Sequence, residues 1–378
     1  MKDIFVIDIS GKVIGYDYAL CGELCKVAPV TIVAHKQGNE TYGGKCLPLI
    51  RLIPARYKNS EHIVKRFFKA LESLLNYIWL LSIIIVKRPT ILHFQWFPFM
   101  EFCSVDNHYV SLIKKIRHKQ KIILTVHNVY PHDMSDRRKK QYRNRFIKSD
   151  RYIDNYIVHV ESSKEELMNE FGIPSEKITV IPHGIFTPDY VPSKRKEHKG
   201  QHIIMYGNNT PYKGTDLLLN ALQELPEDVK RGLNVTIAGR VSETYHKELQ
   251  NKAHGLSVNI IPEFIPDQQL YEMIDEADFI ALPYRNISQS GVLLLALYFR
   301  KPLLISDLPS FKETLKGFSE DMFFEADNVP SLAQLIERHL RGEIDTERQM
   351  EIIDGLVELY SWEKSAEKTK ALYDEILK

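Results

Sequence analysis

The sequence is poor in cysteine and has no long hydrophobic run. Its four cysteines, Cys21, Cys25, Cys46 and Cys103, include no Cys-x-x-Cys pair and all lie in the first third of the 378 residues. They could not link the whole chain by disulfides, so a reducing, cytoplasmic environment fits best. The longest apolar stretch, Ile78–Val86, is short of the roughly 20 residues of a membrane-spanning helix, and we interpret it as a buried helix.

Signals that define other protein classes are absent as well. No Gly-x-Gly-x-x-Gly occurs, which disfavours an oxidoreductase that binds a dinucleotide. No low-complexity tract or fixed repeat is present. Met1–Asp8 has charges around only four apolar residues, so we interpret it as a first strand and not as a signal peptide.

Charge is distributed unevenly along the chain. Residues 1–190 carry 28 Lys and Arg against 19 Asp and Glu, a net +9, and the remainder carries a net −8. The densest basic segments are Arg51–Lys69 and Arg137–Lys148, the latter interleaved with Tyr142 and Phe146. An anionic partner of the first half, either a membrane surface or a phosphate-bearing acceptor, is one interpretation, and solvated helix faces are the other. No nucleic-acid partner is expected, because no recognition module accompanies the charge.

Short apolar runs alternate with longer amphipathic stretches, which predicts α/β structure with parallel sheets. The expected strands are Ile4–Ile9, Val30–Ala34, Ile91–Gln95, Ile122–Val126, Tyr156–Val160, Ile178–Ile181, Ile203–Tyr206, Asn234–Ala238, Val258–Ile261, Phe279–Leu282 and Leu303–Ser306. The expected helices are Ser60–Val86, Val105–His118, Ser163–Phe171, Gly214–Leu222, Glu243–His254, Asp267–Asp275, Gly291–Phe299 and Ser331–Leu340.

A polar stretch between Tyr190 and Gln201 interrupts this alternation and has the composition of a linker. We therefore predict two doubly wound, Rossmann-like domains, residues 1–188 and 200–360, joined by residues 189–199. Ligands of such domains bind at the carboxyl ends of the strands, so a cleft between the domains is the expected site.

Two glycine-containing turns follow predicted strands of the second domain. Gly207 ends one strand, and Lys213 lies just before the next helix, where it could hold a pyrophosphate beside unpaired N–H groups. The spacing is not that of a Walker loop, and an ordinary capped turn is the alternative. Gly239 and Arg240 end the following strand in a similar way, although Arg240 alone could be a surface residue.

A third polar loop of the second domain runs from Tyr284 to an apolar helix. Gln289, Ser290 and Gly291 provide a hydroxyl and bare N–H groups at the helix start, which is an arrangement suited to anions. Ser290 as a plain helix cap is compatible with the same geometry.

In the first domain, histidines follow two predicted strands. His127, with Asn128, comes directly after a buried strand and could bind sugar hydroxyls or carry a proton. His132 is interpreted as a surface residue, and His183 as a turn residue near the hinge.

Taken in order, these segments resemble glycosyltransferase family 4 and its close relatives over nearly the whole chain. The motifs that carry the resemblance are Gly11 with Gly15, His127–Asn128, Val180–Gly184, Lys213–Gly214, Ala238–Gly239, Gly291 with Ala296, Phe299–Asp307 and Tyr360–Trp362. The resemblance implies a GT-B fold, in which residues 361–378 form a last helix that crosses back to the N-terminal domain.

The resemblance also implies an activity. It is a retaining transfer from a UDP- or GDP-sugar to a saccharide or lipid-linked acceptor, without metal or cofactor, and the absence of Asp-x-Asp agrees with this. Lys213 would hold the diphosphate, His127 would act on the sugar or acceptor, and Gly15 and Asn128 would contact the acceptor or sugar. The implied donor-binding residues are Gly207, Asn208, Lys213, Gly239, Arg240, Pro262, Phe264, Ile265, Tyr284, Gln289, Ser290, Gly291 and Val292.

Two positions depart from the family pattern. Asn208 and Asn209 stand where the family has an arginine, so Arg240 is a candidate for the missing charge. The family's paired glutamates are missing, and Leu295 occupies the second position. These departures leave two alternatives open, a non-catalytic GT-B-like subunit that binds a partner or glycan, and a nucleotide-sugar 2-epimerase. The basic first domain further predicts reversible association with the inner face of the membrane.

Overall fold

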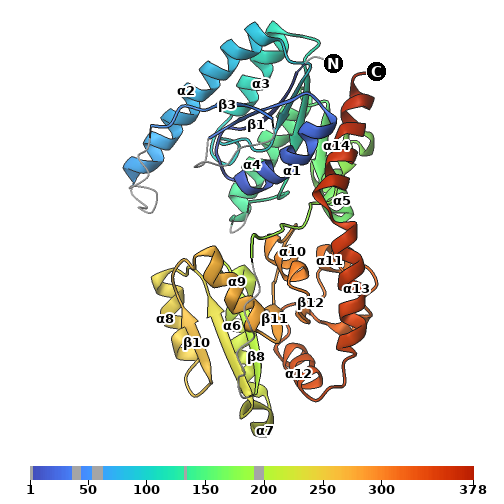
Figure 1. Ribbon diagram of the computed structural model, residues 1–378. Coiled ribbons are helices and arrows are strands. Elements are labelled where there is room, and N and C mark those ends of the chain that lie inside the picture. The colour runs from blue at the N-terminus through green and yellow to red at the C-terminus, as the bar shows by residue number, and fades with distance from the viewer. Residues whose placement is uncertain (1–2, 36–43, 53–62, 132–133, 191–199) are drawn as a thin grey trace. The chain divides into compact units, whose positions relative to one another are not determined.

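A computed structural model describes residues 3–35, 44–52, 63–131, 134–190 and 200–378, with the backbone alone for residues 63–67. The chain divides into two units, Met1–Gly184 together with Ser361–Lys378, and Ile185–Tyr360. Each unit is a parallel β-sheet flanked by helices, which confirms the expected class of two Rossmann-like domains (Figure 1). Residues 191–199 of the expected linker, His132, and most of Arg51–Lys69 lie outside the described residues.

The first unit contains a seven-stranded sheet in the order β3-β2-β1-β4-β5-β6-β7. The strands are β1 (Ile4–Asp8), β2 (Val30–Ala34), β3 (Lys45–Pro48), β4 (Ile91–Phe94), β5 (Lys121–Thr125), β6 (Asn155–Val158) and β7 (Ile178–Val180). The helices are α1 (Ile14–Val27), α2 (Ile63–Lys87), α3 (Val105–Ile116), α4 (Asp136–Asp150), α5 (Glu161–Phe171) and α14 (Trp362–Ile376). Strand order reverses between β1 and β4, which is where doubly wound sheets open a ligand crevice.

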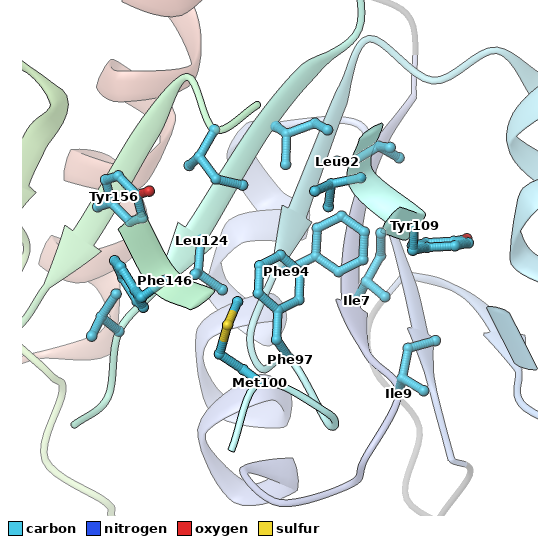
Figure 2. Packing of buried hydrophobic residues seen from close by; sticks show 14 of the residues in the cluster. Ile7, Ile9, Leu92, Phe94, Phe97, Met100, Tyr109, Leu124, Phe146 and Tyr156 are labelled. Carbon is cyan, nitrogen blue, oxygen red and sulfur yellow. The ribbon is translucent and has the colours of Figure 1, made fainter. Parts of the chain in front are cut away.

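Alternate side chains of these strands form the core of the first unit. Phe94 and Leu124 come from neighbouring strands and pack with Phe97 and Met100, which follow β4 (Figure 2). The hydroxyl of Tyr77 on α2 donates to Asp106 on α3 at 2.6 Å, and the two tyrosine rings Tyr77 and Tyr109 stack at 3.9 Å. This polar contact holds α2 against the body of the unit.

The expectation that Ile78–Val86 is a buried helix segment is wrong in part. It belongs to α2, and only 33% of the span Phe68–Lys87 is buried. That span is also long and apolar enough to cross a membrane, by length and composition alone. Periodicity could not reveal this, because α2 is apolar on the face that packs and on the face that does not.

The C-terminal helix α14 packs on α1, as the family resemblance implied. Trp362 begins this helix, and its indole ring lies 5.2 Å from the ring of Tyr16 on α1. A Cβ on Gly184 would come within 2.4 Å of the same indole, so only glycine fits there. Ser365 donates to the carbonyl of Pro182 at 2.7 Å, which fixes the start of α14 to the end of the first unit.

The second unit contains a six-stranded sheet in the order β10-β9-β8-β11-β12-β13. Its strands are β8 (Gln201–Tyr206), β9 (Leu233–Ala238), β10 (Val258–Ile261), β11 (Phe279–Leu282), β12 (Leu303–Ser306) and β13 (Phe323–Phe324). Its helices are α6 (Thr215–Glu224), α7 (Glu227–Lys230), α8 (Glu243–Lys252), α9 (Asp267–Glu276), α10 (Gly291–Tyr298), α11 (Pro309–Thr314), α12 (Val329–Leu340) and α13 (Thr346–Leu359). Strand order reverses between β8 and β11.

Candidate functional site

The predicted donor-binding residues of the second unit follow the carboxyl ends of four adjacent strands, β10, β9, β8 and β11. Gly207 and Asn208 follow β8, Gly239 and Arg240 follow β9, and Tyr284 follows β11. Because β8 lies between β9 and β11, the strand order reverses between β8 and β11, which is the switch point of the sheet. The sequence motifs therefore meet at the edge where such sheets bind ligands.

Two glycines allow the loops at this edge to touch. Gly239 has a φ of 131°, and a Cβ there would lie 2.1 Å from the carbonyl oxygen of Gly207. Gly214 has a φ of 71°, and a Cβ there would lie 1.9 Å from the carbonyl oxygen of Pro283. No side chain fits at either position, so the loops after β8, β9 and β11 pack backbone against backbone.

Lys213 lies inside this convergence of loops. Its side chain is buried, and its Nζ lies 2.9 Å from the point that a Cβ on Gly207 would occupy. Val292 approaches the same point within 3.3 Å, so the lysine and the start of α10 both border Gly207. Among the described residues no carboxylate pairs with the ammonium, and burial lowers the pKa of Lys213 to about 8. A buried, unpaired cation in a loop crevice is suited to an anionic ligand.

The N-terminus of α10 lies beside the lysine. Ser290 is the helix cap, and its hydroxyl accepts from the amide of Leu293 at 3.1 Å. The amides of Gly291 and Val292 are the first two of the helix and have no partner within it. The carbonyl of Val292 accepts from the Tyr206 hydroxyl at 2.8 Å, which fixes this turn to β8. Both interpretations of Ser290 therefore hold together, since the cap leaves two amides for a ligand.

Arg285, which sequence reasoning missed, holds the lysine loop in place. Its guanidinium donates to both carboxylate oxygens of Asp216, at 2.8 and 2.9 Å, and to the carbonyl of Pro211 at 2.7 Å. It also pairs with Asp327 at 2.6 Å. Its position directly after Tyr284 was the available signal, but only the fold shows that it bridges the loop after β11 to the turn that carries Lys213.

The remaining predicted donor residues differ in their surroundings. Phe264 is 60% exposed, and the Arg240 guanidinium lies 5.0 Å from the centre of its ring. Pro262 and Asn208 are exposed, and Gln289 is half-buried. Ile265 and Tyr284 do not face solvent, because their side chains are buried in the core cluster under α9 and α10. Neither side chain is therefore available to a ligand, which corrects the prediction for both residues.

Asn209, one of the two residues that stand where the family has an arginine, holds neighbouring loops together. Its backbone amide donates to the Arg240 carbonyl at 2.7 Å, and its side-chain amide donates to the Gly239 carbonyl at 3.1 Å. Thr215 donates to the Asn209 side chain at 3.1 Å. Asn209 therefore ties the loop after β8 to the loop after β9 and to α6. Leu295, in the position of a family glutamate, is half-buried on α10.

At the first unit's carboxyl edge, Asp8 organises the loop after β1. Its carboxylate accepts from the amides of Ser10 and Gly11 and from the Ser10 hydroxyl, at 2.9 to 3.0 Å, and from the amide of Val13 at 3.3 Å. Gly11 has a φ of 63°, which this turn requires. Gly15 follows, exposed in the first turn of α1. The glycine loop of the family resemblance is thus a carboxylate-capped turn.

His127 follows β5 and lies in a cluster of buried rings. Tyr16 is at the centre of this cluster, with its ring centre 4.7 Å from His127, 5.3 Å from His159 and 4.9 Å from His183. Burial and the neighbouring imidazoles lower the pKa of His127 well below its usual value. His127 is therefore neutral at pH 7, which favours hydrogen bonding over the proton transfer that the sequence also allowed.

Two contacts bear on which nitrogen of His127 carries its proton. His159 Nδ1 lies 3.0 Å from the carbonyl oxygen of Ile181, so it must donate. The Nε2 of neutral His159 is then an acceptor for His127 Nδ1, 3.2 Å away. His127 Nε2 lies 3.4 Å from Oε1 of Gln95, an oxygen that only accepts, so this second contact calls for the proton on Nε2. A neutral His127 carries one proton and can donate to only one of these two partners, which leaves its other nitrogen as an acceptor.

A small cavity of about 30 Å³ is lined by His127, Asn128 and Trp96. The Lys12 ammonium lies 4.2 Å from the centre of the Trp96 indole and pairs with Glu101 at 2.9 Å. These side chains follow β1, β4 and β5, three neighbouring strands. Trp96 and Lys12 carried no sequence motif, and the order of the strands alone brings them to His127.

His183 was interpreted as a turn residue, with a contact to the ligand cleft as the alternative. The structure instead buries it, with its ring 4.8 Å from the centre of Trp362 and its Nδ1 2.6 Å from the carbonyl of Gly184. Burial lowers its pKa to about 3, so it remains neutral. Its role is to pack α14 against the cluster around Tyr16.

Metal ligation is not indicated in the described part of the chain. No group of three or more His, Cys, Asp or Glu side chains lies close enough to hold an ion there.

Two family models match adjoining parts of the chain. Residues 18–187 match "Glycosyltransferase Family 4", and residues 187–354 match "Glycosyl transferases group 1". A GDP-mannose:glycolipid 4-beta-D-mannosyltransferase of Xanthomonas campestris pv. campestris is 22% identical over 126 residues, 33% of this chain and 35% of that protein. The chain thus spans about a third of the length of this curated relative.

Solved structures are similar over the full length. A glycosyltransferase from Rickettsia africae superposes with a TM-score of 0.68 and 18% identity, covering 100% of this chain and 99% of the other. Anabaena HepE, solved with UDP and glucose, superposes with a TM-score of 0.66 and 13% identity, covering 99% and 100%. At these identities the likeness concerns the fold. The two domain models and this shared architecture identify the chain as a GT-B protein that resembles glycosyltransferase family 4.

Proposed function

We propose that this protein is a glycosyltransferase that moves a sugar from a nucleotide-diphosphate sugar to a hydroxyl of a saccharide or lipid-linked acceptor. The observation that carries the proposal is Lys213, a buried ammonium without a carboxylate partner among the described residues. It lies where the loops after β8 and β11 pack against each other, next to the first amides of α10. Fixed positive charge at that point is what a departing diphosphate requires.

In this proposal the donor binds along the loops after β8, β9, β10 and β11. Lys213 and the amides of Gly291 and Val292 hold the diphosphate, and the missing Cβ of Gly207 lets the phosphates approach. The exposed ring of Phe264, with Arg240 above it, offers a stacking surface for the base. Arg240 directly follows Gly239, which packs against Gly207 in the loop that would hold the diphosphate. This position supports Arg240 as the second cation.

During transfer the bond between the anomeric carbon and the diphosphate oxygen breaks, and a bond from the acceptor oxygen to that carbon forms. The negative charge that develops on the diphosphate meets Lys213 and the helix dipole. The acceptor proton needs a base, and His127 is a weak one because its pKa is lowered. We therefore assign that proton to the departing diphosphate oxygen, which places both bonds on one face and retains the configuration. No metal is required in this scheme.

The first unit supplies the proposed site for the transferred sugar or acceptor. His127 can form a hydrogen bond with a sugar hydroxyl, and Asn128 lies in the wall of the same small cavity. The indole of Trp96 adds an apolar surface of the kind on which sugar rings rest. Gly15, exposed in the first turn of α1, leaves room for an acceptor there.

The names of the similar proteins support a UDP- or GDP-sugar as donor and a lipid-linked acceptor. HepE was solved with UDP, and the Xanthomonas relative is named for GDP-mannose and a glycolipid. We propose that this protein acts in polysaccharide or glycoconjugate synthesis in the cytoplasm, at the inner face of the membrane. The net charge of +9 in residues 1–190 supports contact with an anionic surface.

The test uses purified full-length protein and a panel of UDP-, GDP-, ADP- and CMP-sugars. Thermal shift identifies the nucleotide, because a ligand of the folded state raises the melting temperature. Slow release of the free nucleotide without acceptor is expected from the matching donor and not from the others. Lys213→Ala should lose this release while it keeps its fold. Nucleotide binding without any turnover, with or without acceptor, would instead favour a non-catalytic subunit.

A further inference from the structure

A second pocket lies at the opposite edge of the first unit's sheet, away from His127. It has a volume of about 470 Å³ and is bordered by the amino ends of β4 and β5 and by the ends of α2, α3 and α14. Its charged lining is almost entirely basic, with one carboxylate among five Lys and Arg: Arg88, Lys114, Arg117, Lys119, Lys121 and Asp154.

The single carboxylate of the pocket is already paired with groups of the protein. Asp154 accepts from Lys114 at 2.6 Å and from the amide of Ile122 at 2.8 Å, and Lys121 lies 3.8 Å away. Within the described residues, Arg88, Arg117 and Lys119 have no carboxylate partner. Burial, and then the charge of Arg88, lower the pKa of Arg117, and both arginines line the pocket. Uncompensated like charges around a cavity are suited to an anion.

The backbone at Arg88 is strained. Arg88 follows the last residue of α2 with a φ of 52°, and its amide donates to the carbonyl of Ile84 at 3.1 Å. Glycine adopts this helix-ending conformation without cost, whereas a residue with a Cβ does not. The chain therefore places an arginine where glycine would be more stable, next to a second arginine, and strain of this kind gathers at functional positions.

The same end of α2 continues into an exposed apolar surface. Large exposed apolar side chains recur along the outer face of α2 every three or four residues as far as Ile78 and again at its C-terminal end, and we call this face the α2 stripe. Its members are Phe68, Leu71, Leu74, Leu75, Ile78, Ile85 and Val86, with Ile78 68% and Val86 74% exposed. Leu112 and Ile116 on α3 are also exposed beside the pocket, at 41% and 46%. An apolar surface of this extent marks an interaction site.

We propose that the α2 stripe lies in the surface of an anionic membrane, and that the basic pocket at its end holds the phosphate group of a lipid. The chemistry of the two features matches a leaflet, where apolar chains lie beneath a layer of phosphates. A second copy of the chain would bring the same positive charges to the contact. The helix lies along the surface and does not cross it, because Tyr77, Leu80 and Ile84 on its inner face are buried in the core.

Helix α4 provides a matched control. It exposes Arg137, Arg138, Lys139 and Lys140, which belong to one of the two basic segments from which the sequence predicts a membrane contact. Its aromatic residues Tyr142 and Phe146 are buried in the core and Ile147 is its one large exposed apolar residue, so α4 has charge without an apolar stripe. If charge alone determined membrane binding, α4 and the pocket would contribute equally to it. The proposal instead expects the pocket to contribute more, because it lies at the end of the α2 stripe.

The test measures co-sedimentation of the full-length protein with phosphatidylcholine vesicles, with and without phosphatidylglycerol. Wild type should sediment with the anionic vesicles at low salt and not with the neutral ones. Each Lys or Arg near the surface is worth about fivefold in partition, so Arg88→Gln with Lys119→Gln should weaken binding about 25-fold. Ile78→Glu should weaken it by at least about tenfold. The matched pair Arg137→Gln with Lys139→Gln should change it less than about threefold.

Further readouts separate the proposal from its alternatives. Arg88→Gly should raise the melting temperature and still weaken vesicle binding, which a purely structural arginine would not do. UDP or GDP binding should be unchanged in all four variants, so the result is independent of the transferase proposal. Inorganic phosphate should displace the protein from vesicles better than chloride at equal ionic strength.

Several outcomes would overturn the proposal. Absence of binding to anionic vesicles would end it, as would equal losses in the α4 and pocket variants. If inorganic phosphate raises the melting temperature but the protein does not bind vesicles, the pocket takes a free phosphate and not a lipid. A dimeric wild type that Ile78→Glu converts to a monomer in light scattering would mean that a second copy covers the stripe.

Discussion

The affinity for a nucleoside diphosphate should fall as pH rises through 8, because Lys213 binds it in the protonated form. Burial lowers the pKa of this lysine to about 8, so in the free protein it is mostly charged at pH 7 and mostly neutral at pH 9. The bound diphosphate favours the charged form and raises the pKa again. Binding therefore takes up a proton in this range.

The size of the effect follows from the fraction protonated. With a pKa of about 8, the charged fraction falls from about nine-tenths at pH 7 to about one-tenth at pH 9. The apparent dissociation constant for UDP or GDP should rise about tenfold over that range, equal to about 1.4 kcal/mol. A lysine with its usual pKa of about 10.4 would change it by only a few per cent. The nucleotide itself has lost its last phosphate proton near pH 6, so it contributes little.

Calorimetric titration at pH 7, 8 and 9 measures the affinity. At pH 8, repeating the titration in buffers of different ionisation enthalpy counts the protons, and uptake of about half a proton per nucleotide is expected. Lys213→Ala is the control, since it should bind weakly at every pH and take up no proton. An affinity that is the same at pH 7 and pH 9 in wild type, or no proton uptake at pH 8, would refute the assignment.

The same lysine should lower the stability of the free protein. A lysine whose folded pKa is depressed destabilises the fold below that pKa, and the penalty disappears as pH rises from about 8 to about 10.5. Lys213→Met keeps the length of the side chain and removes the charge. At pH 7 it should raise the free energy of unfolding by up to about 3 kcal/mol in urea titration while nucleotide binding is lost. A destabilised methionine variant would contradict the depressed pKa.

Three further outcomes are expected. His127→Ala should lower turnover at saturating donor by at least about tenfold while the affinity for free nucleotide stays within about twofold; the reverse pattern in steady-state kinetics would misplace His127. Arg285→Gln should lower the melting temperature by a few degrees and weaken nucleotide binding about tenfold, because Asp216 and the turn that carries Lys213 lose their contacts with the guanidinium. An unchanged nucleotide affinity in calorimetry would contradict this role of Arg285. Gly239→Ala should cost more than about 2 kcal/mol in chemical unfolding, whereas Gly232→Ala, which has open space, should cost less than about 1 kcal/mol.

Much of the fold was readable from local pattern. A strand buried on both faces, such as Phe279–Leu282, is a continuous apolar run, and the structure places a strand there with the same bounds. Elements with weak patterns were missed. β3 is a half-exposed edge strand of four residues and β13 has two, so neither shows a run long enough to recognise. α1 and α13 were missed as well, although both have a buried face.

Local pattern also located most of the second unit's site, because each loop follows its own strand. Gly207, Lys213, Gly239 and Ser290 lie at the sheet edge that the alternation of strands and helices predicts. Such residues can be found without coordinates, since a parallel α/β sheet sends all of its carboxyl ends to one side.

What the sequence by itself determined is therefore the order of the elements and the loops that carry the chemistry. Only the tertiary structure decided which distant side chains meet. Arg285 reaches Asp216, His183 packs on Trp362, and Ile78 and Val86 on the outer face of α2 stay exposed. The physical reason is that periodicity records whether a residue is apolar, whereas burial and pairing depend on which surface the folded chain brings against it.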